Sequence, residues 1–319
     1  MRGRGRRVAA IHAAVLLALA AAQFVLPPFH HTMLARIMVL AAFASGYNVL
    51  LGYTGLMSLG HAMFFAAGVY GTGLTVYYLG FGAPAAFAVG VMASVVLSTA
   101  VGLLALRTTG VAFLIVTMMF AQVFYLATLY FNRITGGDQG LTLTGRLQPL
   151  AVGAFQLTFA DPAVKYNVAL ATFALCFLST LWLIRSPAGR VLIAIRENED
   201  RTRMLGYNTF RYKLLALVVS GGISGVAGSA YTLLFSYVGS TFASILYSIY
   251  PLLWTLLGGG GTTVGPLLGT WFMTYAVDIA SGITSAYLLA VGAALVILIM
   301  WFPTGIVGGI RARWWRWLP

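Results

Sequence analysis

The chain has 319 residues, of which 60% are hydrophobic and only 8% are charged. A soluble globular protein carries about 25% charged residues, so this composition excludes a water-soluble domain and indicates a protein that lies in lipid. The single cysteine, Cys176, excludes an intramolecular disulfide and a cysteine-cluster metal site, while the formal charge of +13 must be judged from where the basic residues lie.

Ten hydrophobic segments follow one another and predict an all-α, polytopic transmembrane bundle that forms a single domain over residues 1–319. They cover residues 8–28, 33–51, 56–79, 84–106, 111–131, 164–184, 214–237, 245–257, 266–281 and 287–302. The eighth and ninth segments are short and flanked by glycine, so a re-entrant or broken helix is an alternative to a full span at both. A division after the fifth segment would give two five-helix halves of inverted orientation, as in many transporters.

The basic residues orient the bundle, because Lys and Arg gather on the cytoplasmic side of membrane proteins. They form three clusters: Arg2, Arg4, Arg6 and Arg7; then Arg185, Arg190, Arg196, Arg201, Arg203, Arg211 and Lys213; and last Arg311, Arg313 and Arg316. Six segments precede the central cluster and four follow it, so all three clusters can face the cytoplasm. We therefore expect a multi-pass protein of the bacterial inner membrane with cytoplasmic N- and C-termini, and no nucleic-acid site.

The first segment has two interpretations. Its basic start, its apolar run and the small residues at 20–22 also describe a cleavable signal peptide. The apolar run continues through Phe24, Val25 and Leu26, which favours a retained span. Removal of this segment would also leave an odd number of spans before the central basic cluster.

Two loops are long enough to have structure of their own. Residues 132–165 lie outside and contain the run Gly-Gly-Asp-Gln-Gly at 136–140, which is either a turn-rich loop or a cap or landing site for an external partner. Residues 185–213 lie inside. Between Ser186, a capping residue, and Gly206, a helix-ending residue, they predict one short helix.

Opposite charges at helical spacing in this inner loop predict three ion pairs: Arg196–Asp200, Glu197–Arg201 and Glu199–Arg203. Such a run of charges is either a solvated surface helix or a docking helix for a cytoplasmic partner. The residues themselves leave both interpretations open.

Motifs for bound nucleotide or metal are missing. The chain has no Gly-x-x-x-x-Gly-Lys-Ser/Thr sequence and therefore no P-loop for ATP. The glycine-rich run 258–263 lacks the lysine and predicts a tight turn or a close helix contact. The histidines are dispersed along the chain: His12, His30, His31 and His61. We predict no metal, no cofactor and no catalytic site in this chain.

Asp278 is the only acidic residue within a predicted segment and is expected to be a buried carboxylate. An ion-coupled transporter would need more such groups, so the scarcity favours energy supplied by a partner ATPase acting on residues 185–213. The alternatives are an autonomous ion-coupled carrier that uses Asp278 and His61, or an intramembrane enzyme or structural protein, which no constellation supports. Five polar residues are candidates for a pathway, with an interhelical hydrogen bond as the alternative role of each: Tyr53, Ser58, His61, Gln122 and Asp278.

Six blocks, in the same order and over about 260 residues, resemble the LivM-type permeases of branched-chain amino acid ABC importers. They are 52–64 (GYTGLMSLGHAMF), 106–113 (LRTTGVAF), 135–141 (TGGDQGL), 186–206 (beginning SPAGR), 257–266 (LGGGGTTVGP) and 303–309 (PTGIVGG). The chain departs from the family at 237–241, where a Ser-Pro-type turn is more usual, and this departure bears on local loop geometry and on substrate choice.

The resemblance implies a permease subunit for branched-chain or related amino acids, with urea and short amides as alternative solutes. The implied partners are a LivH-type second permease, two cytoplasmic ATPase subunits that bind the ATP, and an external solute-binding protein that largely selects the solute. By the same analogy, the contact with the ATPases falls on one set of residues in the inner loop: Gly189, Arg190, Arg196, Glu197, Asn198, Asp200 and Leu205.

Overall fold

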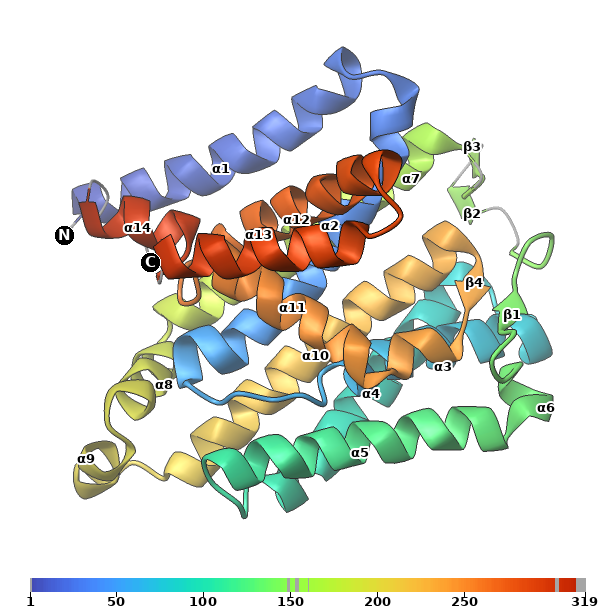
Figure 1. Cartoon of the computed structure of the whole chain (residues 1–319). Coiled ribbons are helices and arrows are strands. Elements are labelled where there is room, and N and C mark those ends of the chain that lie inside the picture. Colours follow the sequence, from blue (N-terminus) through green and yellow to red (C-terminus); the bar gives the residue numbers. More distant parts are fainter. Residues whose placement is uncertain (1, 148–149, 153–154, 160, 302–303, 314–319) are drawn as a thin grey trace.

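The computed structural model describes residues 2–147, 150–152, 155–159, 161–301 and 304–313. This part of the chain is a bundle of α-helices with a few short strands (Figure 1), which confirms the predicted all-α polytopic class. Its elements are α1 (Arg2–Val25), α2 (Pro28–Asn48), the π-helical turn η1 (Val49–Tyr53), α3 (Ala62–Leu79), α4 (Ala83–Ala105), α5 (Val111–Tyr130), α6 (Asn132–Thr135), β1 (Leu141–Thr142), β2 (Leu150–Val152), β3 (Phe155–Leu157), α7 (Pro162–Arg185), α8 (Pro187–Glu197), α9 (Glu199–Met204), α10 (Thr209–Phe235), β4 (Tyr237–Val238), the 3-10 turn η2 (Ser240–Ala243), α11 (Ile245–Gly258), α12 (Gly265–Ile283), α13 (Tyr287–Trp301) and α14 (Ile306–Arg313).

Seven helices are long and apolar enough to cross a membrane, judged over the described residues: α1, α2 continued by η1, α3, α4, α5, α7 and α10. The eighth predicted segment is α11, a helix of 14 residues. At 1.5 Å per residue it rises about 21 Å, which is less than the ~30 Å hydrocarbon core. The ninth and tenth predicted segments correspond to α12 and α13, with 19 and 15 residues.

Helix α10 lies at the centre of the bundle and packs against α2, α3 and α4 (Figure 1). Glycines bring these backbones close together: a Cβ added to Gly68 of α3 would lie 2.9 Å from the Gly225 Cα of α10. The Ser94 hydroxyl of α4 lies 2.9 Å from the carbonyl oxygen of Phe64 and 2.8 Å from that of Gly221. Small residues and hydroxyl hydrogen bonds are common means of helix association in lipid.

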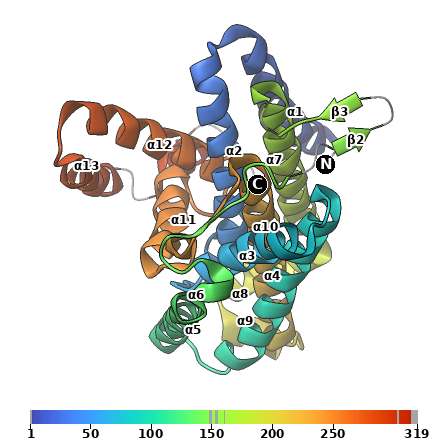
Figure 2. The same cartoon turned by 90° about the vertical axis from the view of Figure 1, so that its right-hand side faces the viewer.

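The two ends of the bundle differ (Figure 1). One end holds α8, α9, α14 and the beginning of α1, and the opposite end holds α6 and the strands. The described residues of the three predicted basic clusters therefore lie at one end of the bundle. Arg316 of the third cluster lies outside the described residues, as does Pro303 of the block 303–309. Figure 2 shows α12 and α13 projecting to one side.

The predicted outer loop packs on the chain that leaves α10. β1 pairs with β4 in antiparallel register, with Leu141 opposite Val238, and the Leu143 amide donates to the Ser236 carbonyl at 2.8 Å. Ser240 donates a hydrogen bond to Asp138 at 3.4 Å. The glycine-rich run at 136–140 is thus held against the segment 237–241.

Candidate functional site

The chain leaves α-helical geometry between α2 and α3. At Val49 α2 passes into the π turn η1, which ends at Tyr53, and α3 begins only at Ala62. Gly55 has a φ of +78°, a value that favours glycine. The predicted segment 56–79 therefore began too early, because residues 56–61 take no helical conformation. Irregular backbone at membrane depth occurs where protein or a water-filled cavity covers it, and such breaks form the solute sites of many transporters.

His61 anchors the end of this irregular segment. Its side chain is fully buried, and its Nε2 lies 3.0 Å from the Ser220 hydroxyl, near the middle of α10. The imidazole contacts the rings of Phe43, at 6.0 Å between centroids, and of Tyr47, at 5.0 Å. These contacts place the break deep within the bundle, between α2 and α10.

The other two candidates near the break, Ser58 and Tyr53, differ in how they are hydrogen-bonded. Tyr47 donates to the Ser58 carbonyl at 3.0 Å, and the Ser58 hydroxyl accepts the Gly60 amide at 3.2 Å. The Tyr53 side chain is buried, and its hydroxyl has no hydrogen-bond partner among the described residues. Ser58 thus holds the bend, whereas Tyr53 retains an unused hydroxyl.

Gln122 and Asp278 are not joined to this break by hydrogen bonds or ion pairs in the described part of the chain. Gln122 is half-buried on α5. The prediction that Asp278 is a buried carboxylate was wrong, because its side chain is exposed. The reason lies in the packing of α12: its buried residues belong to the first part of the helix, up to Thr270, and the later part projects from the bundle (Figure 2).

The inner loop forms two helices, not the predicted single one. As predicted, α8 begins after Ser186, whose hydroxyl accepts the Gly189 amide at 3.1 Å. It ends at Glu197. The next residue, Asn198, has an extended backbone (φ −162°, ψ 104°) and caps α9 by accepting the Arg201 amide at 2.9 Å. Asparagine favours this capping geometry over a helix interior. The break separates the partners of the predicted pairs Arg196–Asp200 and Glu197–Arg201, which do not form.

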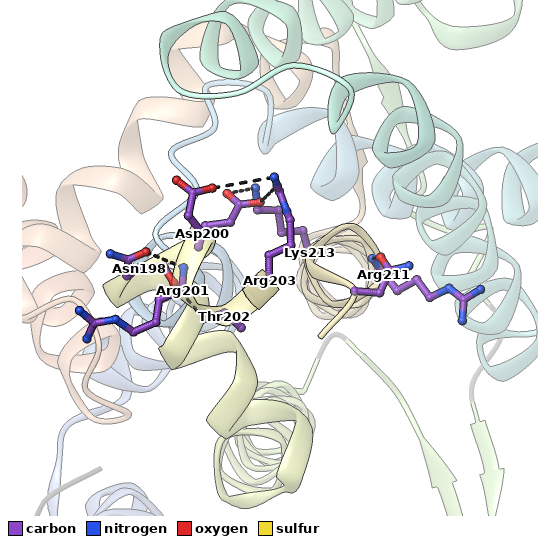
Figure 3. A network of polar contacts seen from close by, with 9 residues as sticks. Asn198, Asp200, Arg201, Thr202, Arg203, Arg211 and Lys213 are labelled. Atoms are coloured by element: carbon purple, nitrogen blue, oxygen red, sulfur yellow. Dashed lines mark hydrogen bonds and ion pairs between the residues drawn. The ribbon is translucent and has the colours of Figure 1, made fainter. Parts of the chain in front are cut away.

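Charged side chains of α9 and of the start of α10 form one network, in which Figure 3 shows Asp200, Arg203 and Lys213 close together. Arg203 forms the predicted pair with Glu199 at 3.3 Å and a longer contact with Asp200 at 3.8 Å. Glu199 also pairs with Lys213 of α10, which is itself buried. Burial raises the pKa of the Glu199 carboxyl, but the hydrogen bond and charge of Lys213, together with Thr209 and Arg203, outweigh burial and hold this pKa below its usual value. This ion pair fastens α9 to the start of α10.

Arg196 turns from α8 into the bundle. Its Nη1 donates to the carbonyl oxygen of Gly52 in η1. Positive charge is favoured at the carbonyl end of a helix, and Gly52 lies where α2 and η1 end. Arg196 also packs against Gly55, where an added Cβ would lie 3.0 Å from the Arg196 Cγ. The inner loop is therefore linked directly to the break between α2 and α3.

The glycine-rich run 258–263 meets the same place. It forms a tight turn, which was one of the two predicted alternatives, with φ values of +116° at Gly259 and +76° at Gly261. The Gly261 amide donates to Asn48 at 2.9 Å, and Asn48 donates to the Thr262 carbonyl at 2.8 Å. Arg311 of α14 donates to the Gly261 carbonyl at 2.9 Å. α2, α8, α14 and this turn thus converge on a few backbone groups.

Of the remaining predicted contact residues, one is buried and the others are exposed. Gly189 is buried against α7, where an added Cβ would lie 2.6 Å from the Ile184 Cα. The others are exposed: Arg190, Glu197, Asn198, Asp200 and Leu205. Leu205 is 71% exposed, and beside it Met204 is 87% exposed. Two large apolar side chains are therefore exposed next to each other at the end of α9.

Sequence reasoning missed Asn48, Ser220 and Ser248. Asn48 is fully buried, and the Ser248 hydroxyl of α11 accepts the Ala62 amide at 2.9 Å, which caps α3. An asparagine inside an apolar segment was a usable signal, since polar groups in a span need partners. Nothing local distinguished the two serines from other small residues.

Comparison of the sequence with known proteins identifies the family of the chain. Residues 30–301 match the family described as branched-chain amino acid transport system / permease component. The chain is 26% identical over 296 residues to the high-affinity branched-chain amino acid transport system permease protein LivM of Salmonella typhimurium, covering 86% of this chain and 69% of the relative. LivM of Escherichia coli is 27% identical over 294 residues, with the same coverage.

A shorter match of 109 residues, 28% identical, joins the chain to the autoinducer 2 import system permease protein LsrC of Salmonella choleraesuis, and covers 32% of this chain and 31% of that relative. No solved structure gives a significant match. The family match covers most of the chain. The chain therefore belongs to the family of permease components of branched-chain amino acid transport systems.

Proposed function

We propose that the chain is the membrane-spanning subunit of an ABC importer in a bacterial inner membrane, and that it forms part of the pathway for branched-chain or related amino acids. In this proposal α8, α9 and both termini face the cytoplasm. The observation that carries the proposal is the bond between Arg196 of α8 and the Gly52 carbonyl. It joins an exposed helix pair at one end of the bundle to a broken helix inside it.

The energy would come from separate subunits. The chain has no P-loop, so two cytoplasmic ATPases would bind the ATP, and this subunit would need no cofactor of its own. Their docking surface would be the exposed tip made by Met204, Leu205 and the charged residues of α8 and α9. A LivH-type permease would complete the pathway in the membrane, and an external solute-binding protein would deliver the solute.

Arg196 supplies a route for force between the two regions. A displacement of α8 by the ATPases would move the guanidinium and, with it, the Gly52 carbonyl. Residues 56–61 lack a helical hydrogen-bond ladder of their own, so the break can change conformation at a lower cost than an intact helix. Asn48 and Arg311 would carry the same displacement to the turn at 258–263 through their bonds to Gly261.

The experiment is uptake of radiolabelled L-leucine by proteoliposomes that contain this chain, the second permease, the ATPases and the binding protein. The wild type is expected to require ATP. Met204→Glu with Leu205→Glu should reduce recovery of the ATPases with the purified permeases by about tenfold, because charges replace apolar contact area. Thr144→Glu, an exposed position at the opposite end, is the matched control.

Two results would contradict the proposal. One is uptake by this chain alone, driven by an ion gradient without ATPases, which is the behaviour of an autonomous carrier. The other is full retention of the ATPases by the double variant at the tip, which would move their docking surface elsewhere.

A further inference from the structure

A cavity of about 410 Å³ lies between the last turns of α3 and the short helix α6, at the end of the bundle opposite α8 and α9 (Figure 1). This volume lies within the range of about 300–1,000 Å³ that is usual for small-molecule sites. The cavity is lined by Leu74, Thr75, Tyr78, Leu79, Arg133 and Ile134. Its lining therefore combines aliphatic side chains with a single charged residue, Arg133.

The hydroxyl groups of the lining are already used within the chain. The Tyr78 hydroxyl lies 3.1 Å from the Arg133 carbonyl oxygen and 3.0 Å from the Ile134 carbonyl oxygen. The Thr75 hydroxyl donates to the Gly71 carbonyl at 2.8 Å. A hydroxyl has one hydrogen to donate, so the guanidinium of Arg133 is the donor that remains for a ligand. The bonds of Tyr78 also fix α6 against α3, which keeps the cavity in shape.

Arg133 differs from the charged residues near it. Asp138, the acidic residue nearest to it in sequence, accepts a hydrogen bond from Ser240 at 3.4 Å. Arg146 donates to the Tyr77 carbonyl at 2.9 Å, and its guanidinium lies 4.0 Å from the centroid of the Tyr77 ring. Arg133 is exposed and forms no ion pair among the described residues. An anion that pairs with it therefore comes from outside the described part of this chain.

Aromatic side chains mark the depth of the cavity in the membrane. α3 and α5 are both long and apolar enough to cross it, so their ends lie near its surface. Tyr78 at the end of α3, Tyr130 at the end of α5 and Phe131 beside it are all exposed. Exposed aromatic rings gather where the lipid headgroups lie. The cavity thus opens at headgroup depth, with its aliphatic residues next to the hydrocarbon.

We propose that this cavity binds an anionic phospholipid. The Arg133 guanidinium takes the phosphate, with which arginine forms bidentate charge-assisted hydrogen bonds. Leu74, Leu79 and Ile134 contact the first part of an acyl chain. A lipid offers an anion and hydrocarbon in one molecule, which is the combination that the lining requires. Bound there, it braces α6 against α3 beside the glycine-rich run at 136–140. The site is additional to the proposed transport function and does not depend on it.

The test is native mass spectrometry of the purified permease complex with added dioleoylphosphatidylglycerol or dioleoylphosphatidylcholine. The wild type should bind the first molecule of phosphatidylglycerol about tenfold more tightly, because the choline cation offsets the phosphate charge. Arg133→Gln should lose this tenfold preference while its affinity for phosphatidylcholine stays within about twofold of wild type, which also shows that the variant is folded. Lys165→Gln is the matched control, since Lys165 is a cation near the start of α7, at the same end, and does not line the cavity.

The apolar part of the site has its own measurement. Leu79→Ser with Ile134→Ser should weaken the binding of both lipids by about fivefold, because hydrocarbon contact is lost without a change of charge. Glycerol phosphate carries the anion without acyl chains. In molar excess it should leave phosphatidylglycerol bound, which distinguishes a lipid from a soluble phosphate ester.

Four results would overturn the proposal. Two are equal binding of phosphatidylglycerol by wild type and Arg133→Gln, and equal binding of the two lipids by wild type. The third is displacement by glycerol phosphate, which would make the ligand a soluble anion. The fourth is phosphatidylglycerol bound to this chain alone but absent from the complex, which would mean that the second permease covers the cavity. Failure of ATP-dependent uptake, which would contradict the proposed function, leaves these lipid measurements unchanged.

Discussion

Arg196 of α8 donates a hydrogen bond to the backbone carbonyl of Gly52, 144 residues earlier in the chain, where η1 ends α2. The bond crosses from the surface helix pair to the interior of the bundle. It uses a backbone carbonyl as the acceptor, so the side chain at position 52 is not needed for it. In the proposed importer Arg196 would be a positioning residue, whose loss should affect coupling more than folding.

Arg196→Gln should uncouple the importer. A hydrogen bond to a charged group contributes about 1.5–3 kcal/mol, so we expect leucine uptake per ATP hydrolysed to fall about tenfold, measured in proteoliposomes. Arg107→Gln is the matched control, since Arg107 lies outside α8 and α9, is exposed and forms no ion pair among the described residues. An unchanged ratio of uptake to hydrolysis in Arg196→Gln would show that force takes another route.

Gly52→Ala should destabilise the junction. A Cβ at position 52 would collide with the Asn48 side chain and the Gly261 amide, and overpacking of this kind costs about 1–3 kcal/mol. The apparent Tm of the purified complex should fall by about 5 °C, measured by intrinsic fluorescence. Gly82→Ala is the control, because a Cβ there meets only Pro84, at 4.0 Å. Equal melting of both variants would refute the close contact.

The pair of Glu199 with Lys213 predicts an acid-sensitive attachment of α9. Because the pKa of Glu199 is lower in the folded protein than its ordinary value of 4.5, the pair stabilises the fold above that value. The stabilisation is lost as the pH falls through the folded pKa, when the carboxyl is protonated. When the pH is lowered from neutral into the acid range, the apparent Tm of Glu199→Gln should therefore fall less than that of wild type.

Asp200→Asn is the control for this measurement, because Asp200 makes only the longer contact with Arg203. The melting curve of this variant should follow that of wild type as the solution is acidified. Identical acid dependence in wild type and Glu199→Gln would mean that other carboxyl groups govern the transition.

His61→Gln should reduce stability but retain ATP-dependent uptake. The imidazole contacts several aromatic rings, and each such pair contributes about 0.5–1.5 kcal/mol, whereas Ser220→Ala removes one membrane hydrogen bond of about 0.6 kcal/mol. The apparent Tm should therefore fall further for His61→Gln than for Ser220→Ala. Complete loss of uptake by a stable His61→Gln importer would instead indicate that His61 carries a proton in transport.

Several features could be predicted because they depend on neighbouring residues. The apolar runs of α1, α2, α4, α5 and α7 match the predicted segments closely, since lipid requires each run to form its own backbone hydrogen bonds. The cap at Ser186 and the turn at 258–263 followed from local preferences of serine and glycine. The family resemblance rested on such local blocks as well.

Hydrophobicity and motifs are local properties, and they were sufficient to predict a helical membrane protein, the positions of most of its helices and its family. The contacts of Arg196 with Gly52 and of His61 with Ser220, and the exposure of Asp278, could be learned only from the folded chain. Each of these depends on residues far apart in the chain, or on which face of a helix finds a neighbour. The break at Asn198 could not be predicted locally either. The ion pair of Glu199 with Lys213 holds α9 on α10 and favours the cap at Asn198 over a continuous helix.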